Sequence, residues 1–222
     1  TGHYWKCCAR YLKKIDWIKV VTVNPHHVKK SKEFDDNCQT KSDKKDCMTI
    51  ARLIKDARYF EPYLPEGVWA ELRNLSNTRA ELVRKQNAVK TRLIATMDEY
   101  FPEYAKVFKQ ILSRTSEEIL KECPFPEDIK SKGKEGLLKH IKETVKRGYS
   151  KKQVEKIYKA AEESIGSEEG INGAKFQTKM YIEEAEMLKK QIKMTEEELE
   201  KQLKETGFYE SIISIKGIGV VS

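Results

Sequence analysis

The stretch "LRNLSNTRAELVRKQNAVKTRLIATMDEY" (Leu72–Tyr100) decides the fold of this chain of 222 residues. One set of side chains, from Leu72 to Tyr100, recurs there at alternating steps of three and four residues. This is the spacing of one face of a coiled-coil helix. Pro102 predicts the end of this helix, because proline disfavours helical backbone in the residue before it. We therefore expect one long helix over about residues 67–99. Its predicted face consists of Leu72, Leu75, Arg79, Leu82, Gln86, Val89, Leu93, Thr96 and Tyr100.

A second stretch, about residues 169–206, repeats this pattern, so the sequence predicts two long helices of matching length. Shorter helices are expected between them, one starting near residue 115 and two near 134–147 and 150–165. The proline- and glycine-containing stretch 123–136 is expected to be a loop. The intervening helices let the chain return, which favours an antiparallel hairpin. The predicted face of the second helix consists of Ile171, Ala174, Thr178, Tyr181, Ala185, Leu188, Ile192, Thr195, Leu199 and Gln202.

The first quarter of the chain has a different pattern. Residues 1–14 predict a helix whose polar side carries Arg10, Lys13 and Lys14. The run "WIKVVTV" (Trp17–Val23) predicts a buried strand, since it is rich in β-branched residues and ends at Asn-Pro. Residues 26–42 indicate a loop or a short helix, and a further helix can begin at Ser42. The fold class expected is therefore mostly α with a small α/β part.

The charge of the chain favours a polyanionic partner. The formal net charge is +8, and residues 1–60 hold fourteen basic against seven acidic residues. Such a field attracts nucleic acid, although plain solubility remains an alternative explanation. No apolar run is long enough to span a membrane, and five cysteines without framework spacing indicate reduced thiols in the cytoplasm. The lysines expected to contact phosphates are Lys29, Lys30, Lys32, Lys41, Lys44 and Lys45.

Two acids interrupt this basic segment in "TKSDKKDCMTIARLI" (Thr40–Ile54). If a helix begins there, Asp43 and Asp46 lie three residues apart on one face. Two close carboxylates repel each other unless a cation lies between them, and oxygen ligands suit Mg²⁺ or Mn²⁺. Two acids are fewer than a two-metal phosphoryl-transfer site needs. The alternative, an interaction of both acids with the positive end of the helix dipole, stays open at this point.

Several motifs together resemble one family. "TGHYW", "VVTVNP", "KSDKKDCMTIARLI", "LRNLSNTRAELVRKQNAVKTRLIATMDEYFPEY" and "SIISIKGIG" occur in the order found in insertion-sequence transposases with a RuvC-like DEDD domain, the IS-one-ten group. The resemblance implies an RNase-H-like catalytic fold and four metal-binding acids, Asp-Glu-Asp-Asp. The last two correspond to Asp43 and Asp46, with Cys47 where alanine is common.

The same resemblance implies how the chain is divided. Residues 1–60 would form the later part of the catalytic domain, residues 61–206 a coiled-coil and helical dimerisation domain, and residues 207–222 the start of a C-terminal domain. The other two acids and a nucleophilic serine would lie outside the chain. We therefore expect a piece truncated at both ends that does not cut DNA alone, from a nucleoid-associated protein of a bacterium or archaeon.

The resemblance also implies partners, namely DNA, a homodimer formed through the coiled coil and, in some members, a structured guide RNA. The function expected is that of a metal-dependent DNA transposase or recombinase. The main alternative is a non-catalytic coiled-coil module that dimerises and binds nucleic acid. An RNase-H-like nuclease or junction resolvase ranks last, because it needs neither the long helices nor the "GIG" segment.

Overall fold

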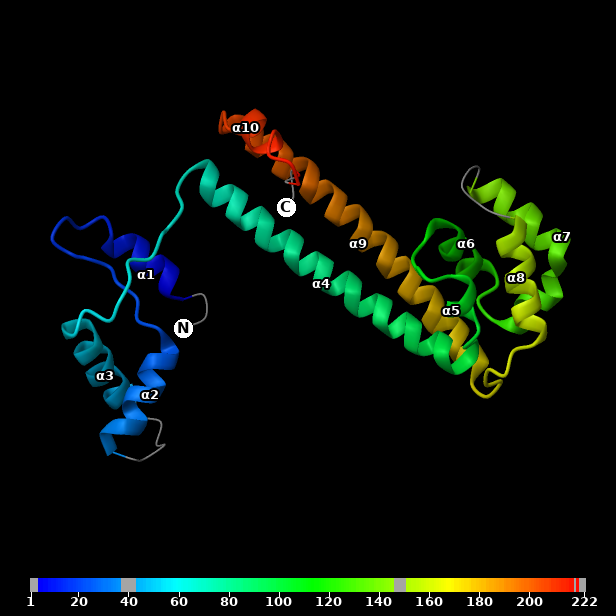
Figure 1. Ribbon diagram of the computed structural model, residues 1–222, viewed down its shortest axis with the longest axis horizontal. Helices are drawn as coiled ribbons and strands as arrows, with labels where there is room; N and C mark the ends of the chain where they lie inside the picture. The colour runs from blue at the N-terminus through cyan, green and yellow to red at the C-terminus, as the bar shows by residue number, and fades with distance from the viewer. Residues whose placement is uncertain (1–3, 37–42, 146–150, 218, 220–222) are drawn as a thin grey trace. The chain divides into compact units, whose positions relative to one another are not determined.

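The structure is a computed structural model that describes residues 4–36, 43–145, 151–217 and 219 (Figure 1). The described part is almost entirely helical, which confirms the prediction of a mostly α fold. The chain divides into two compact units, Thr1–Ala70 and Glu71–Ser222. None of the described helices is long and apolar enough to cross a membrane.

The first unit contains α1 (Trp5–Leu12), α2 (Pro25–Asp36) and α3 (Asp43–Lys55). Helix α2 lies where the sequence left a loop or a short helix open. Its start has a clear cause, because Oδ1 of Asn24 accepts a hydrogen bond from the backbone N–H of His26 at 2.9 Å. Pro25 then occupies the first helical position, where its missing N–H costs nothing. The predicted cap of α3, Ser42, lies outside the described residues.

The strand predicted at residues 17–23 is reduced to a single β-bridge. Thr22 N donates to Phe60 O at 2.8 Å, and Phe60 N donates to Thr22 O at 3.0 Å. Within the described residues no further ladder extends this pair. Two short segments without a third neighbouring strand are not stable as a sheet. The β-propensity of residues 17–23 therefore does not produce a sheet here. The small α/β part is therefore not confirmed.

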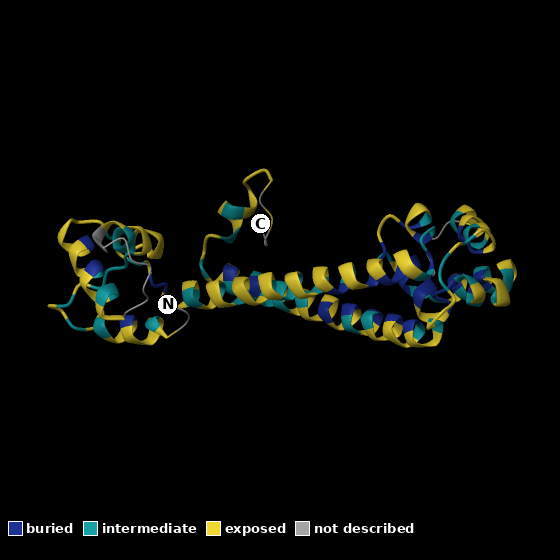
Figure 2. Ribbon diagram, turned by 90° about the horizontal axis from the view of Figure 1, so that it is seen from below, coloured by how far each residue is buried: buried dark blue, intermediate teal, exposed yellow. Residues whose placement is uncertain are grey.

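An antiparallel hairpin of α4 (Val68–Tyr100) and α9 (Ile171–Glu205) runs through the second unit, as the sequence predicts, and only the first turn of α4 belongs to the first unit. Arg79 Nε donates to Glu196 Oε1 at 2.8 Å, and Val89 packs further along with Ala185. Contacting residues thus have increasing residue numbers along α4 and decreasing residue numbers along α9, so the two helices are antiparallel. Both predicted faces are buried or half-buried along their length, whereas the outer faces are exposed (Figure 2). Coiled-coil packing itself remains a prediction.

Four short helices pack at the closed end of this hairpin. They are α5 (Tyr104–Val107), α6 (Arg114–Glu122), α7 (Pro126–Val145) and α8 (Lys151–Glu162). With the adjoining ends of α4 and α9 they form the main core. The largest fully buried side chains of this core are Tyr104, Phe101, Phe125, Leu93, Ile119, Leu120, Ile129, Leu137, Ile141, Ile157 and Ile182.

The loop predicted over residues 123–136 is wrong for most of that stretch, because α7 already begins at Pro126. Proline fits the first helical turn, and the side chain of Asp128 accepts a hydrogen bond from Phe125 N at 3.3 Å. The glycine signal has a real but smaller effect. Gly133 has a φ of 69°, which kinks α7 instead of preventing it.

The chain ends with α10 (Tyr209–Ile213), which contacts α9 through a hydrogen bond from Tyr209 Oη to Glu200 Oε1 at 2.9 Å. The "GIG" segment that follows lies partly outside the described residues. The predicted division at residues 60–61 and 206–207 stays a prediction, as does the role of residues 207–222.

Thr178 provides a test of the packing inside the hairpin. Its side chain is fully buried and its hydroxyl has no hydrogen-bond partner in the described structure. A buried unsatisfied hydroxyl costs about 1–3 kcal/mol, so Thr178→Val is expected to raise the free energy of unfolding by about 1 kcal/mol. Thr96→Val is the control, since Thr96 Oγ1 donates to Arg92 O at 3.1 Å. Chemical denaturation in which both variants behave alike would contradict this explanation.

Candidate functional site

Helix α3 carries both predicted metal ligands in its first turn. Asp46 is followed at helical spacing by Thr49 and Leu53, which are buried. These three residues therefore lie on one side of α3, and this side packs against α2. Asp46 is half-buried as a consequence, whereas Asp43 is exposed. The two carboxylates are neighbours on the helix surface but lie in different surroundings.

The C-terminal end of α3 is stabilised by a backbone hydrogen bond just beyond the helix. Ala57 adopts a left-handed conformation with a φ of 57°, and Arg58 N donates to Leu53 O at 2.8 Å. This arrangement closes the last helical turn. The chain then returns along residues 19–22, where Lys19 Nζ lies 2.6 Å from Glu61 Oε1. The hydrogen bond and the charge of Glu61 raise the pKa of Lys19, as does the nearby Tyr59.

An ion pair joins Asp46 to Lys32 of α2. The lysine side chain is 18% exposed and the carboxylate 42%, so water screens this pair only in part. The sequence places Lys32 among the phosphate contacts, but here its ammonium group neutralises one of the two predicted metal ligands. Sequence reasoning missed this pairing because the two residues are fourteen positions apart and belong to different helices.

The remaining predicted phosphate contacts are not equivalent. Lys29 and Lys44 are exposed, and Lys45 is half-buried. Lys30 Nζ lies 3.4 Å from Glu33 Oε2, in a pair between neighbours on one helix. Lys41 lies outside the described residues. The structure thus leaves the role of these lysines in binding nucleic acid as a prediction.

The donor atoms of the aspartates suit a hard divalent cation in kind but not in number. Both supply carboxylate oxygens, the ligands that Mg²⁺ and Mn²⁺ prefer. Among the described residues, however, no group of three or more histidine, cysteine, aspartate or glutamate side chains could hold a metal ion. Asp43 and Asp46 can therefore form only part of a catalytic metal site.

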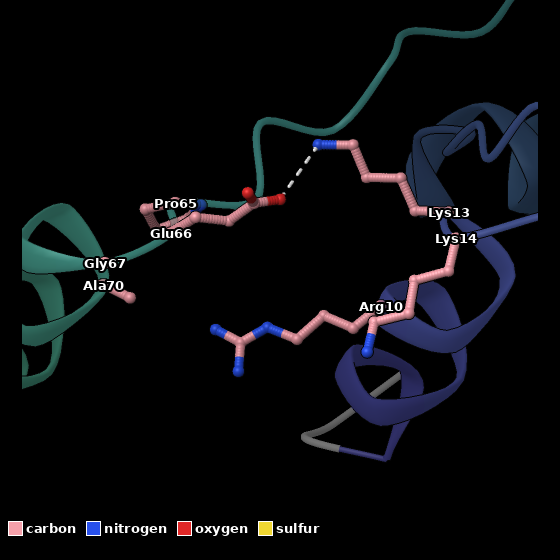
Figure 3. A pocket seen from close by; sticks show the side chains of 7 residues that line it. All are labelled: Arg10, Lys13, Lys14, Pro65, Glu66, Gly67 and Ala70. Carbon is pink, nitrogen blue, oxygen red and sulfur yellow. Dashed lines mark ion pairs between the residues drawn. The ribbon is translucent and has the colours of Figure 1, made fainter.

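A basic hollow lies in the same unit and was not assigned a role from the sequence. Arg10, Lys13 and Lys14 extend from the end of α1 toward residues 65–70 (Figure 3). The hollow has a volume of about 480 Å³, and Lys13 Nζ lies 3.7 Å from Glu66 Oε1 at its edge. The one signal in the sequence was the position of the three cations on the polar side of the predicted first helix.

The first unit also contains an apolar pocket, with a volume of about 590 Å³. It is lined by α1, by residues 20–25, by Ile50 and Ile54 of α3, and by Phe60. The apolar run that predicted a buried strand therefore does contact other apolar side chains, but along the wall of an open pocket. The aspartate-bearing helix thus has one side on α2 and another on this pocket.

Comparison with known proteins identifies the first part of the chain. Residues 1–102 match the family model of the DEDD transposases of the IS-one-ten group, which is described as "Transposase". No curated protein matches the chain. The matched residues include α1–α3 and the whole of α4, and thus both aspartates and the basic hollow. The similarity of the chain to the DEDD insertion-sequence transposases therefore extends over residues 1–102 of its 222 residues.

Proposed function

We propose that this chain is part of a metal-dependent DNA transposase in which Asp43 and Asp46 are ligands of Mg²⁺ or Mn²⁺. The observation that carries the proposal is the position of both carboxylates in the first turn of α3, within the residues that match the family. When bound, the cation would supply the charge stabilisation that phosphoryl transfer requires. The two carboxylates would hold it together with acids from outside the described residues.

Lys32 has a definite part in this proposal. Without a cation, its ammonium group offsets the charge of Asp46 and holds that carboxylate on the side of α3 that faces α2. A divalent cation bound to Asp46 would compete with Lys32 for the same carboxylate. Lys32 is thus a positioning residue that keeps the ligand ordered before the metal binds.

The DNA contacts in this proposal are electrostatic. Lys29 of α2 and Lys44 of α3 are exposed, and the basic hollow adds three cations at the end of α1 and just after it. Lysine contacts to phosphates fix position and carry no sequence information. A structured guide RNA would be held by the same kind of contact. DNA strand cleavage and exchange in this proposal therefore depend on the acids, and binding depends on the basic surface.

The test is strand exchange by the transposase that contains this chain, in the presence of Mg²⁺. Asp43→Asn and Asp46→Asn are each expected to lower the rate by about 100-fold or more. Even residues that only hydrogen-bond to a metal ligand change metal affinity or activity by about 10–100-fold when they are substituted. DNA affinity should be retained, since asparagine removes no cation. Asp56→Asn is the matched control, because Asp56 is exposed just beyond the other end of α3. Undiminished exchange in both site variants would refute the metal assignment.

A further inference from the structure

A second hollow adjoins the basic hollow in the first unit. It has a volume of about 400 Å³, and both hollows are lined by Lys13. Leu64 lines the second hollow and Pro65 lines the basic hollow, so the two follow one another along one stretch of chain. Trp17 lies on the wall of the second hollow, which we call the Trp17 hollow.

The side chain of Trp17 is held outward. The residue is 84% exposed, and no hydrogen bond or ring contact joins its indole to another described residue. Its backbone lies in a turn that is closed by a hydrogen bond from Ile18 N to Ile15 O at 3.0 Å. So large an apolar ring gains free energy when it is covered. Trp17 is therefore placed to cover itself with a planar ligand.

Two of the cations near this ring are already paired. Lys19 is joined to Glu61, as described above for the segment that follows α3. Lys13 Nζ lies 3.7 Å from Glu66 Oε1, and these two side chains are 52% and 80% exposed. Water screens exposed pairs of this kind, which contribute little. A phosphate can therefore compete with Glu66 for Lys13.

Arg10 and Lys14 are the cations that remain available to a ligand. Both are exposed, and no ion pair joins either of them to another described residue. Asp16, which lines the Trp17 hollow, offsets part of their charge. Charge alone therefore gives this surface only a modest affinity for an anion. A ligand that uses it well must also contact the indole ring.

We propose that Trp17 stacks on an unpaired base of a single-stranded nucleic acid, whose phosphates lie in the basic hollow against Arg10 and Lys14. Aromatic rings beside a basic groove bind single strands in this way, whatever their sequence. The bases of a duplex are stacked on one another, so Trp17 reaches only a base outside the duplex. The Trp17 hollow also lies within the range of roughly 300–1,000 Å³ of small-ligand pockets, which leaves room for one base.

This proposal rests on the nucleic-acid contacts proposed above, but it does not depend on the metal ligands. The lysines of α2 and α3 contact phosphates, which single strands and duplexes both present. Trp17 adds a preference for bases that have left the duplex. Strand exchange requires such bases, and stacking on Trp17 would keep a separated strand from pairing again.

Binding of labelled oligonucleotides to the whole chain, without divalent cations, tests the proposal. An oligothymidylate of about 20 nucleotides is longer than the roughly 4–16 nucleotides that one single-strand-binding fold covers. We expect it to bind more tightly than a duplex of the same length, and Trp17→Ala to weaken its binding about tenfold. Phe176→Ala is the matched control and should have no effect, because Phe176 is 67% exposed but lies on α9 in the second unit. Circular dichroism checks that both variants are folded.

An abasic strand separates stacking from charge, because it has the same phosphates but no bases. The unsubstituted chain should bind it about tenfold more weakly than oligothymidylate, and Trp17→Ala should cause no further loss. Arg10→Ala and Lys14→Ala should instead weaken binding of both strands alike, and each should lower the salt slope by about 0.7. An equal loss of affinity in Trp17→Ala on both strands would overturn the proposal.

Tryptophan fluorescence checks the contact itself, since a base that stacks on an indole quenches its emission. Oligothymidylate should quench the emission of the unsubstituted chain and have much less effect on Trp17→Phe, which keeps Trp5 and Trp69. Equal quenching in both proteins would contradict stacking on Trp17.

The remaining outcomes separate this proposal from the proposed function. Oligouridylate replaces oligothymidylate in a parallel titration, and binding of either strand that depends on Trp17 supports the proposal. The tighter of the two identifies DNA or RNA as the source of the base. A chain that binds neither strand nor duplex would refute this proposal together with the nucleic-acid contacts proposed above. Equal affinity for strand and duplex, unaffected by Trp17→Ala, would refute this proposal alone.

Discussion

Gly166→Ala is expected to lower the free energy of unfolding of the second unit by about 3–5 kcal/mol, which is near the upper limit for single substitutions. An ideal Cβ at this position would lie 2.1 Å from the backbone O of Tyr100 and 2.4 Å from its C. Both are backbone atoms at the end of α4, so no side-chain rotation can relieve the clash. The segment or the helix end must move instead.

Neighbouring contacts prevent such a movement. Ser167 N donates to Glu99 O at 2.9 Å, and Ser164 Oγ donates to Glu103 Oε2 at 2.8 Å. Burial raises the pKa of Glu103, but the hydrogen bonds from Ser164 and from backbone N–H groups outweigh it and leave this pKa below its usual value. Gly166 therefore lies in a segment that is held on one side to the end of α4, through Glu99, and on the other to Glu103 just before α5.

Thermal unfolding measures the effect, at about 2–4 °C per kcal/mol in a chain of this size. Gly173→Ala is the control, because a Cβ at Gly173 meets nothing within 4 Å and Gly173 lies inside α9. Alanine is the better helix former by up to about 1 kcal/mol, so this control should leave the protein unchanged or slightly stabilised. Equal midpoints for Gly166→Ala and the unsubstituted protein would show that the close approach is not required.

Tyr104→Ala is expected to cost about 3–5 kcal/mol, the usual cost of removing a fully buried aromatic ring. Tyr104 is 1% exposed, and its ring centroid lies 5.6 Å from that of Phe101 and 5.2 Å from that of Phe108. Its hydroxyl lies 2.7 Å from Ser116 Oγ, which donates to Ile111 O at 2.7 Å. Tyr104 thus connects α5 and α6 through both apolar and polar contacts.

Tyr104→Phe separates the two contributions. It keeps the ring and leaves the bond from Ser116 to Ile111 intact, so a loss of only about 1 kcal/mol is expected. Burial raises the pKa of Tyr104, although the hydrogen bond with Ser116 acts in the opposite direction. A raised pKa stabilises the folded state below the unfolded pKa, about 10, and this contribution is lost as the pH rises above it. Denaturation at pH 9 and 11 should show a weaker alkaline loss in Tyr104→Phe.

The sequence predicted the helices better than the contacts between them. Periodic spacing identified both long helices, and Pro102 correctly ended the first, because these signals are local. The strand predicted at residues 17–23 was not confirmed, because β-propensity leads to a strand only when neighbouring strands complete a sheet. The loop predicted over residues 123–136 was wrong for most of that stretch, because a proline can occupy the first turn of a helix as well as end one.

The candidate site shows the same division. The helix start expected at Ser42 correctly placed Asp43 and Asp46 in a first helical turn, and their assignment as metal ligands remains a proposal. The partner of Asp46 could not be read from the sequence, since Lys32 meets it only when α2 folds onto α3. Gly166 gave no signal either, because its constraint comes from Tyr100, far away along the chain. Long-range contacts of this kind leave no local pattern.

The hairpin also constrains the order in which the chain folds. The contact between Glu99 and Ser167 closes a loop of intermediate length, whereas the contact between Arg79 and Glu196 joins residues 117 positions apart. Loop closure becomes more costly with length, and contacts distant in sequence form slowly. We therefore expect the short helices to pack first and to bring the adjoining ends of α4 and α9 together. Contacts between the two long helices would then form progressively toward their far ends, so Arg79 and Glu196 are expected to pair last on folding and to separate first on unfolding.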